Sequence, residues 1–330
     1  MDSQMTAVES HVTSLKMNEA AAEIADGMAD QADILRVRAH RLPGGARVID
    51  AGVEVDGGIE AGLAMSEICL GGLGNVTTTP VQIGGQSYPG LIVWTDHPAV
   101  ACMASQYAGW AISVGKYFAM GSGPLRAHAR VERELFEKLG YEERAEEAVL
   151  VLETRALPTD EVADWVARKA QLQPSQLTFV VAPTASLAGG VQISARIVET
   201  GLHKMETLGF DVRRVVSALG TAPLPPVAKN DLKAIGRTND CILYGGQARF
   251  TIRAGDAELE KLAEQVPASA SRDYGTPFYE IFKRYDGDFY KIDPLLFSPG
   301  EIWLTSTETG RTFHTGRLNP DVLEASLYNL

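Results

Sequence analysis

An arginine and a glutamate three residues apart, Arg196 and Glu199, have the types and spacing that water-activating chemistry requires. Residues three apart on a helix are neighbours on one face. A guanidinium beside a carboxylate can hold it ionised and oriented, and such a carboxylate can act as a general base for the attack of water. The alternative is a solvated ion pair, which would contribute only roughly 0.2–1 kcal/mol to stability.

The segment around this pair reads as a strand, a turn containing glycine, and then an amphipathic helix over residues 191–208. Apolar residues at steps of four and three predict one buried stripe: Val191, Ala195, Val198, Leu202, Met205 and Leu208. A polar stripe lies one position further round: Gln192, Arg196, Glu199 and His203. We therefore expect one helix to carry the candidate pair at the edge of a buried face.

Length and charge limit the possible classes of protein. The chain has 330 residues, of which 45% are hydrophobic and 22% charged, and these values are typical of a soluble globular protein with a sizeable core. A formal net charge of −12 argues against a general binder of nucleic acid or of anionic membranes. No apolar run reaches the roughly 18–20 residues of a membrane span, and the polar N-terminal stretch, helical in pattern, has no secretory-signal order.

The cysteines and histidines do not predict a metal site. Three cysteines far apart in sequence, Cys69, Cys102 and Cys241, suggest free buried thiols in a reducing compartment, so we expect a cytoplasmic protein. The six histidines form no close pair. Asp96 and His97 with Cys102 could ligate a metal in principle, but the preferred interpretation gives them roles at a strand end and a helix start.

Phosphate-binding motifs are incomplete. The stretch from Gly121 through Ser122 and Gly123 has two of the three glycines of a dinucleotide fingerprint, and the residue after Lys116 is tyrosine where a P-loop has Ser or Thr. We therefore expect neither a Rossmann fold nor a nucleotide cofactor. The glycine-rich turns at residues 71–74 and 121–123 could present N–H groups to an anion or could simply be sharp turns.

A cationic stripe is the other candidate for ligand binding. Lys229, Lys233 and Arg237 stand at four-residue steps on a helix predicted to open at Pro226 and stop at Gly236. They could meet a phosphate or carboxylate tail. The alternative is an ordinary solvated helix face.

The order of elements favours a mixed α/β protein of the α+β kind. Hairpins are predicted at 34–55, at 76–95 and, over Gly245 and Gly246, at 241–254. Helices are predicted at 97–114, 125–139 and 212–219, and residues 115–124 as a loop. Strands at 148–152 and 177–181 flank a helix capped at Thr159, which makes a strand–helix–strand unit. A charged segment at 141–147 suggests two lobes, residues 1–145 and 146–330.

Several long strings resemble one family, methenyltetrahydromethanopterin cyclohydrolase. They are residues 67–74 (EICLGGLG), 93–110 (VWTDHPAVACMASQYAGW), 112–124 (ISVGKYFAMGSGP), 181–200 (VAPTASLAGGVQISARIVET), 226–240 (PVAKNDLKAIGRTND) and 290–299 (YKIDPLLFSP). The resemblance extends over nearly the whole chain, from about residue 53 to 313.

This resemblance implies a fold, a reaction and a site. It implies a homotrimer of two-lobed subunits, with largely antiparallel sheets and helices and a ligand pocket between the lobes. The implied reaction is the reversible hydrolysis of the cyclic methenyl cation of a pterin one-carbon carrier to its N5-formyl form, without metal or nucleotide. The family's catalytic arginine and glutamate correspond to Arg196 and Glu199. For substrate binding we select Gln192, Ser194, Lys229, Lys233, Arg237, Lys116 and Ser122.

We thus expect a cytoplasmic hydrolase of one-carbon metabolism that needs no cofactor and takes a small pterin substrate. It would bind neither nucleic acid nor membrane. The alternative is a protein of the same fold that binds a pterin or phosphate ligand without turnover.

Overall fold

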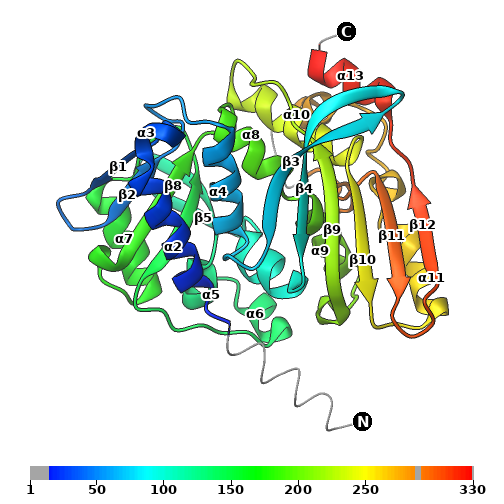
Figure 1. The fold of residues 1–330 in the computed structure, drawn as a ribbon, viewed down its shortest axis with the longest axis horizontal. Coiled ribbons are helices and arrows are strands. Elements are labelled where there is room, and N and C mark those ends of the chain that lie inside the picture. Colours follow the sequence, from blue (N-terminus) through cyan, green and yellow to red (C-terminus); the bar gives the residue numbers. More distant parts are fainter. Residues whose placement is uncertain (1–14, 287–290, 329–330) are drawn as a thin grey trace. The chain divides into compact units, whose positions relative to one another are not determined.

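The computed structural model describes residues 15–286 and 291–328, and its chain divides into two compact units (Figure 1). The first unit takes the chain up to Leu73 and then Val100–Pro183, and the second takes Gly74–Ala99 and the chain from Thr184 onward. Residues 145 and 146, the predicted boundary between two lobes, both lie in the first unit. Residues 1–14, the start of the predicted N-terminal helix, lie outside the described residues.

A six-stranded mixed sheet forms the centre of the first unit, in the order β1-β2-β8-β7-β6-β5. Its strands are β1 (Arg38–Arg41), β2 (Arg47–Asp50), β5 (Trp110–Val114), β6 (Tyr117–Ser122), β7 (Ala148–Glu153) and β8 (Leu177–Ala182). The central β2–β8 and β8–β7 pairings are parallel, and the others in this sheet are antiparallel.

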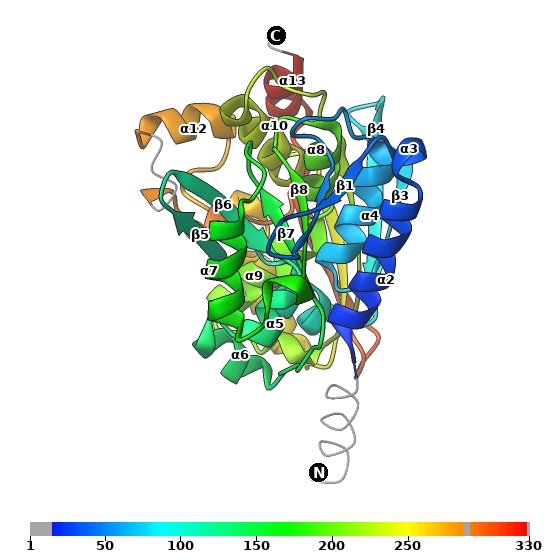
Figure 2. The same cartoon turned by 90° about the vertical axis from the view of Figure 1, so that its left-hand side faces the viewer.

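Helices cover both faces of this sheet. They are α2 (Met17–Asp30), α3 (Ala32–Leu35), α4 (Ile59–Cys69), α5 (Leu125–Ala129), α6 (Arg133–Leu139) and α7 (Asp160–Ala170), with a 3-10 turn η2 (Pro174–Gln176). Figure 2 shows α7 on one side of β7 and β8, with α2 and α4 on the other. The predicted strand–helix–strand unit is confirmed as β7–α7–β8, because parallel neighbours need a crossover between them.

The second unit is also built on a six-stranded sheet, in the order β12-β11-β10-β9-β4-β3. Its strands are β3 (Asn75–Ile83), β4 (Gln86–Thr95), β9 (Val215–Pro223), β10 (Gln247–Ile252), β11 (Glu301–Ser306) and β12 (Thr312–Gly316). Only β10 and β11 pair in parallel within the described strands of this sheet.

The helices of the second unit include the segment that carries the candidate pair. They are α8 (Leu187–Ser194), α9 (Ile197–Thr207), α10 (Asp231–Leu243), α11 (Asp256–Gln265), α12 (Phe278–Arg284) and α13 (Pro320–Tyr328), with 3-10 turns η3 (Val212–Arg214), η4 (Ala268–Ala270) and η6 (Pro294–Leu296). Helices α9 and α11 lie against one face of the sheet (Figure 1). A second apolar core forms around α10, α12 and the β3–β4 hairpin.

Several local predictions are wrong, and strand pairing explains most of them. The predicted helix at 97–114 is a π-helix, η1 (Ala99–Gln106), followed by β5, and the predicted loop at 115–124 contains β6. The predicted helix at 212–219 is largely strand β9. Short apolar runs are ambiguous between helix and strand, and here strand pairing decides the outcome. Strand β5 pairs with β6 in a hairpin, β6 also pairs with β7, and β9 pairs with β4 and β10.

Two further predictions fail at turns. The predicted hairpin at 241–254 is the end of α10 followed by β10, whose neighbours β9 and β11 pair with it from elsewhere in the chain. The predicted helix at 125–139 is divided into α5 and α6, because Arg130 takes the left-handed conformation (φ 47°). The hairpins at β1–β2 and β3–β4 are confirmed.

The predicted fold class, mixed α/β with largely antiparallel sheets, is confirmed by the two mixed sheets. Among the strand pairings that the structure describes, the antiparallel ones predominate in both sheets. No helix in the described part of the chain combines the length and apolar character that crossing a membrane requires.

Candidate functional site

The junction between α8 and α9 positions the candidate pair. The predicted continuous helix over 191–208 is wrong, since α8 ends at Ser194 and α9 begins at Ile197. At this junction the Arg196 N–H donates to the carbonyl of Ile193, three residues back, at 3.0 Å. This tightened turn makes Arg196 the residue that precedes α9 and places Glu199 in its first turn.

The pair is buried. Arg196 is 8% exposed and Glu199 5%. Arg196 Nη1 lies 3.8 Å from Glu199 Oε2, and Arg196 Nη2 donates to Gln192 Oε1 at 3.2 Å. The structure therefore contradicts the alternative of a solvated ion pair. Two features favour a negative charge on Glu199, because it faces a guanidinium and lies near the N-terminal end of the α9 dipole.

Two glycines hold the first turn of α9 on the sheet. A Cβ atom added at Gly220, on β9, would lie 2.8 Å from Ile197, and one added at Gly246, before β10, would lie 2.4 Å from it. Both distances are shorter than van der Waals contact, so only glycine permits this close approach. Ile197 thereby fixes the turn that lies between Arg196 and Glu199.

Lys204, which is not among the predicted site residues, anchors the rest of α9. Its side chain is fully buried, and Nζ donates to the carbonyl of Pro267 at 2.9 Å and to that of Leu295. Burial lowers the pKa of this amine to about 8. The available signal was its place between the buried residues Leu202 and Met205, where a lysine needs polar partners.

Gln192 and Ser194 lie on α8 close to the pair. Both are fully buried. Gln192 supports Arg196 through the bond described above. The Ser194 hydroxyl has no hydrogen-bond partner among the residues that the structure describes. A buried hydroxyl of this kind is expected to receive a partner from a bound ligand or a water molecule.

The cationic candidates lie at the start of α10. This helix runs from Asp231 to Leu243, so the predicted helix from Pro226 to Gly236 is wrong and Lys229 precedes the helix. The side chain of Asn230 caps it by accepting the Lys233 N–H, which fixes the start. Lys229 and Lys233 are exposed, whereas Arg237 is half-buried and donates to the carbonyl of Pro226 at 3.2 Å.

A hydrogen bond joins the first residue of α10 to the segment just before α8. Asp231 Oδ1 accepts the N–H of Ala185 at 2.9 Å, two residues before α8 begins. The cationic candidates and the Arg196–Glu199 pair therefore belong to the same unit and to helices that contact each other.

Lys116 and Ser122 belong to the first unit, on the β5–β6 hairpin. Lys116 is exposed in the turn of this hairpin. Ser122, at the end of β6, is 2% exposed, and its Oγ lies 3.5 Å from Cys69 Sγ. The structure thus gives these two residues very different surroundings, one in solvent and one in the interior.

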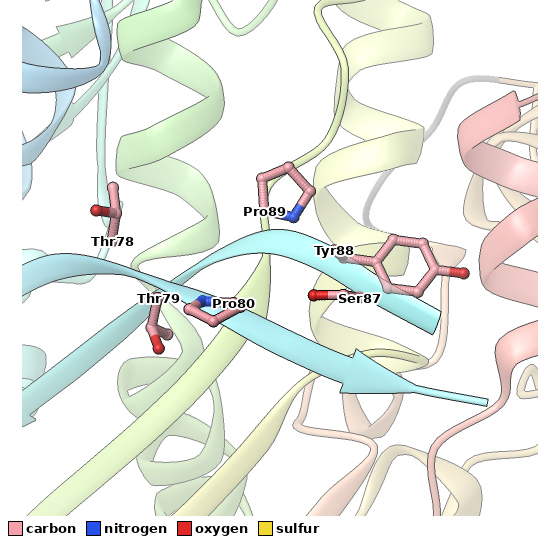
Figure 3. Close-up of a pocket in the computed structure, with 6 residues that line it drawn as sticks. All are labelled: Thr78, Thr79, Pro80, Ser87, Tyr88 and Pro89. Atoms are coloured by element: carbon pink, nitrogen blue, oxygen red, sulfur yellow. The ribbon is translucent and has the colours of Figure 1, made fainter. Parts of the chain in front are cut away.

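A surface pocket of about 460 Å³ lies on the β3–β4 hairpin (Figure 3). Its lining consists of Thr78, Thr79, Pro80, Ser87, Tyr88 and Pro89, and includes none of the candidate residues. The Tyr88 hydroxyl donates to Glu324 at 2.8 Å. In the described ranges, no group of three or more His, Cys, Asp or Glu side chains is placed to hold a metal ion.

Comparisons with known proteins agree with the resemblance seen in the sequence. A model of the cyclohydrolase (MCH) family matches residues 16–327. A methenyltetrahydromethanopterin cyclohydrolase of Methanococcoides burtonii is 44% identical over 94% of this chain and 97% of its own length. One of Methylobacillus flagellatus is 47% identical over 91% of both chains, and one of Methanocaldococcus jannaschii is 43% identical over 95% and 98%. The chain therefore belongs to the methenyltetrahydromethanopterin cyclohydrolase family.

Proposed function

We propose that this chain catalyses the reversible hydrolysis of the methenyl-tetrahydromethanopterin cation to N5-formyl-tetrahydromethanopterin. Membership of the family over residues 16–327 supports the reaction, since relatives over 40% identical across more than nine-tenths of the chain bear its name. The observation that carries the mechanism is the buried Arg196–Glu199 pair at the start of α9.

Glu199 serves as the general base in this proposal. The reacting carbon lies between two nitrogens of an amidinium-like cation and is already electrophilic. Water is a weak nucleophile at neutral pH, so a carboxylate must accept its proton as the new C–O bond forms. A cation bound near Glu199 also favours the ionised carboxylate, so the substrate itself helps to prepare its base.

The same residue then assists the second step. One C–N bond of the tetrahedral intermediate breaks as the carbonyl forms, and the departing nitrogen takes the proton from Glu199. The hydroxyl proton of the intermediate is released to solvent. One water is added and one proton is released overall, which balances the conversion of a cation into a neutral formyl amide.

Arg196 orients the base, and the remaining candidates bind the substrate. The guanidinium fixes the Glu199 carboxylate from 3.8 Å and is itself held by Gln192. Ser194 offers a buried hydroxyl beside this pair in sequence. The cationic side chains of Lys229, Lys233, Arg237 and Lys116 would contact an anionic tail, and Ser122 would donate a hydrogen bond.

Loss of the substrate's absorbance on hydrolysis tests the proposal. We expect Glu199→Gln to lower kcat by about 10²–10⁴-fold, because the amide cannot accept the proton. Glu206→Gln, seven residues later on the same helix, is the matched control and should retain wild-type kcat. Binding without turnover in the wild-type protein would favour a ligand-binding protein, and undiminished turnover in Glu199→Gln would remove this base.

Charge reversal at the start of α10 tests where the tail binds. Lys229→Glu and Lys233→Glu are expected to raise KM more than they lower kcat, because the tail takes no part in the chemistry. Lys261→Glu on α11 is a control with the same change of charge. An unchanged KM in both α10 variants would contradict this placement.

A further inference from the structure

Arg126 is a fully buried charge in the first unit that the proposed mechanism does not use. It stands in the first turn of α5, and its Nη1 donates to the carbonyls of Met103 at 3.2 Å and Ser105 at 3.0 Å. Its Nε and Nη2 both donate to Glu132 Oε1, at 3.0 and 2.7 Å. One guanidinium therefore links the end of the π-helix η1 to the residue that precedes α6.

Aromatic rings and a glycine enclose this ion pair. The guanidinium carbon lies 5.2 Å from the centre of the Tyr107 ring and 5.8 Å from that of Phe136, within the range of cation–π attraction. A Cβ atom added at Gly109 would lie 1.6 Å from Glu132 Oε1. The carboxylate thus lies directly against the backbone that follows Tyr107, and a larger residue at position 109 would displace it.

The carbonyl of Ser105 connects the pair to the Ser122 turn. This oxygen accepts both Arg126 Nη1 and the Gly123 N–H, the latter at 2.8 Å. The Ser105 hydroxyl donates to the Cys69 carbonyl at 2.6 Å, and Cys69 Sγ in turn lies 3.5 Å from Ser122 Oγ. Ser122 is thereby held from two sides by groups that Ser105 fixes.

We propose that the Arg126–Glu132 pair is a positioning device that holds Ser122 and the following turn in the geometry that binds the substrate. This inference rests on the proposed function, which assigns Ser122 to substrate binding. Desolvation offsets much of the attraction within a buried ion pair, so this pair contributes little to stability through charge alone. Its main contribution is to fix the orientation of the Met103 and Ser105 carbonyls, and through Ser105 the position of Gly123.

Glu132→Gln tests the proposal, because it keeps the shape of the side chain and removes the charge that orients the guanidinium. We expect KM for the methenyl substrate to rise about tenfold with kcat within about threefold of wild type. Glu142→Gln is the matched control, since it removes the partner of Arg130 in an exposed pair of the same region. An unchanged KM in Glu132→Gln would overturn the proposal.

A double-mutant cycle separates positioning of Ser122 from general loosening of the unit. In a Ser122→Ala background, Glu132→Gln should raise KM by less than about twofold, because the hydroxyl it positions is gone. The same tenfold rise in both backgrounds would contradict the proposal. If Glu132→Gln does not fold, Glu132→Asp keeps the charge and should give a smaller rise in KM, again abolished by Ser122→Ala.

The two proposals fail in different ways. Absence of turnover in the wild-type protein would refute the proposed function. Normal turnover in the wild-type protein, together with an unaltered KM in the Glu132 variants, would refute only the positioning role. Dissociation constants measured in the Glu199→Gln background supply a binding readout that does not depend on catalysis.

Discussion

Both units of this chain contain a buried arginine paired with a glutamate, and the two pairs are built differently. In the first unit, Glu132 accepts two hydrogen bonds from Arg126, the shorter of 2.7 Å, while the same guanidinium holds two backbone carbonyls. In the second unit, Arg196 and Glu199 approach only to 3.8 Å, which is beyond hydrogen-bonding distance.

In the proposed mechanism, this difference separates a pair that holds the fold from a pair that takes part in the chemistry. A guanidinium that makes four hydrogen bonds is committed to a fixed arrangement of the backbone. A carboxylate held by charge at 3.8 Å is oriented without its oxygen being claimed by that guanidinium, so it can still accept a proton from water. Both arginines are buried, and Glu132 is only partly exposed, so burial alone would not distinguish the two pairs.

The largest loss of stability is expected when the arginine of the first pair, Arg126, is removed. Arg126→Met should lower the free energy of unfolding by about 3–5 kcal/mol, because it leaves the Glu132 carboxylate without its buried partner. Arg196→Met should lower it by a smaller amount, because the contact that it removes from the buried Glu199 carboxylate spans 3.8 Å and is not a hydrogen bond. Urea denaturation measures both values, and equal losses would show that the two pairs do not differ in how much they stabilise the fold.

A smaller loss of stability is expected when the turn that carries Arg196 and Glu199 is displaced. In Gly246→Ala, the added methyl group would lie 2.5 Å from the Ile242 carbonyl as well as 2.4 Å from Ile197, so the first turn of α9 must shift. We expect a loss of about 1–3 kcal/mol in unfolding free energy together with a lower kcat. Gly27→Ala, in α2, is the control: its methyl would meet nothing within 4 Å and should be tolerated.

Arg196→Lys tests the second pair alone, because it keeps the positive charge and removes the planar guanidinium. Lysine cannot contact Gln192 and Glu199 with two fixed N–H groups, so Glu199, the proposed base, would no longer be held in one orientation. We expect kcat to fall about tenfold, equivalent to about 1.4 kcal/mol in the barrier, with the unfolding free energy nearly unchanged. Steady-state kinetics beside thermal melts measure this, and wild-type kcat would show that charge alone is enough.

Asp240 shows what burial does to a carboxyl group in another setting. On α10 it accepts the Phe278 N–H at 2.9 Å, and desolvation raises its pKa to about 7. The unfolded value is about 3.9. Between these values the folded protein binds more protons, so Asp240 should make stability fall as pH rises from about 4 to 7, by at most about 1.4 kcal/mol per pH unit.

Urea midpoints at pH 5 and pH 7.5 test this linkage. The wild-type protein should lose more stability between the two values than Asp240→Asn, which carries no titrating group at this position. An identical pH dependence in both proteins would show that Asp240 does not titrate in this range.

The sequence by itself determined much about this protein. Local patterns predicted the spacing of Arg196 and Glu199, the β7–α7–β8 crossover and the mixed α/β class. They also predicted the apolar stripe from Val191 to Leu208, which is buried as far as Met205 and partly exposed at Leu208. Such features are predictable because helix periodicity and crossover connections are set by neighbouring residues. The long matching strings also indicated the family, because sequences can be compared without knowing which residues are in contact.

Only the tertiary structure decided the rest. Strands β6, β9 and β10, the burial of Lys204 and the fully buried Arg126 depend on partners far away in sequence. An apolar run becomes a strand when a distant strand offers it hydrogen bonds, and a charged residue enters the core when distant carbonyls or carboxylates receive it. Those partners meet only in the folded chain, so no local pattern reports them.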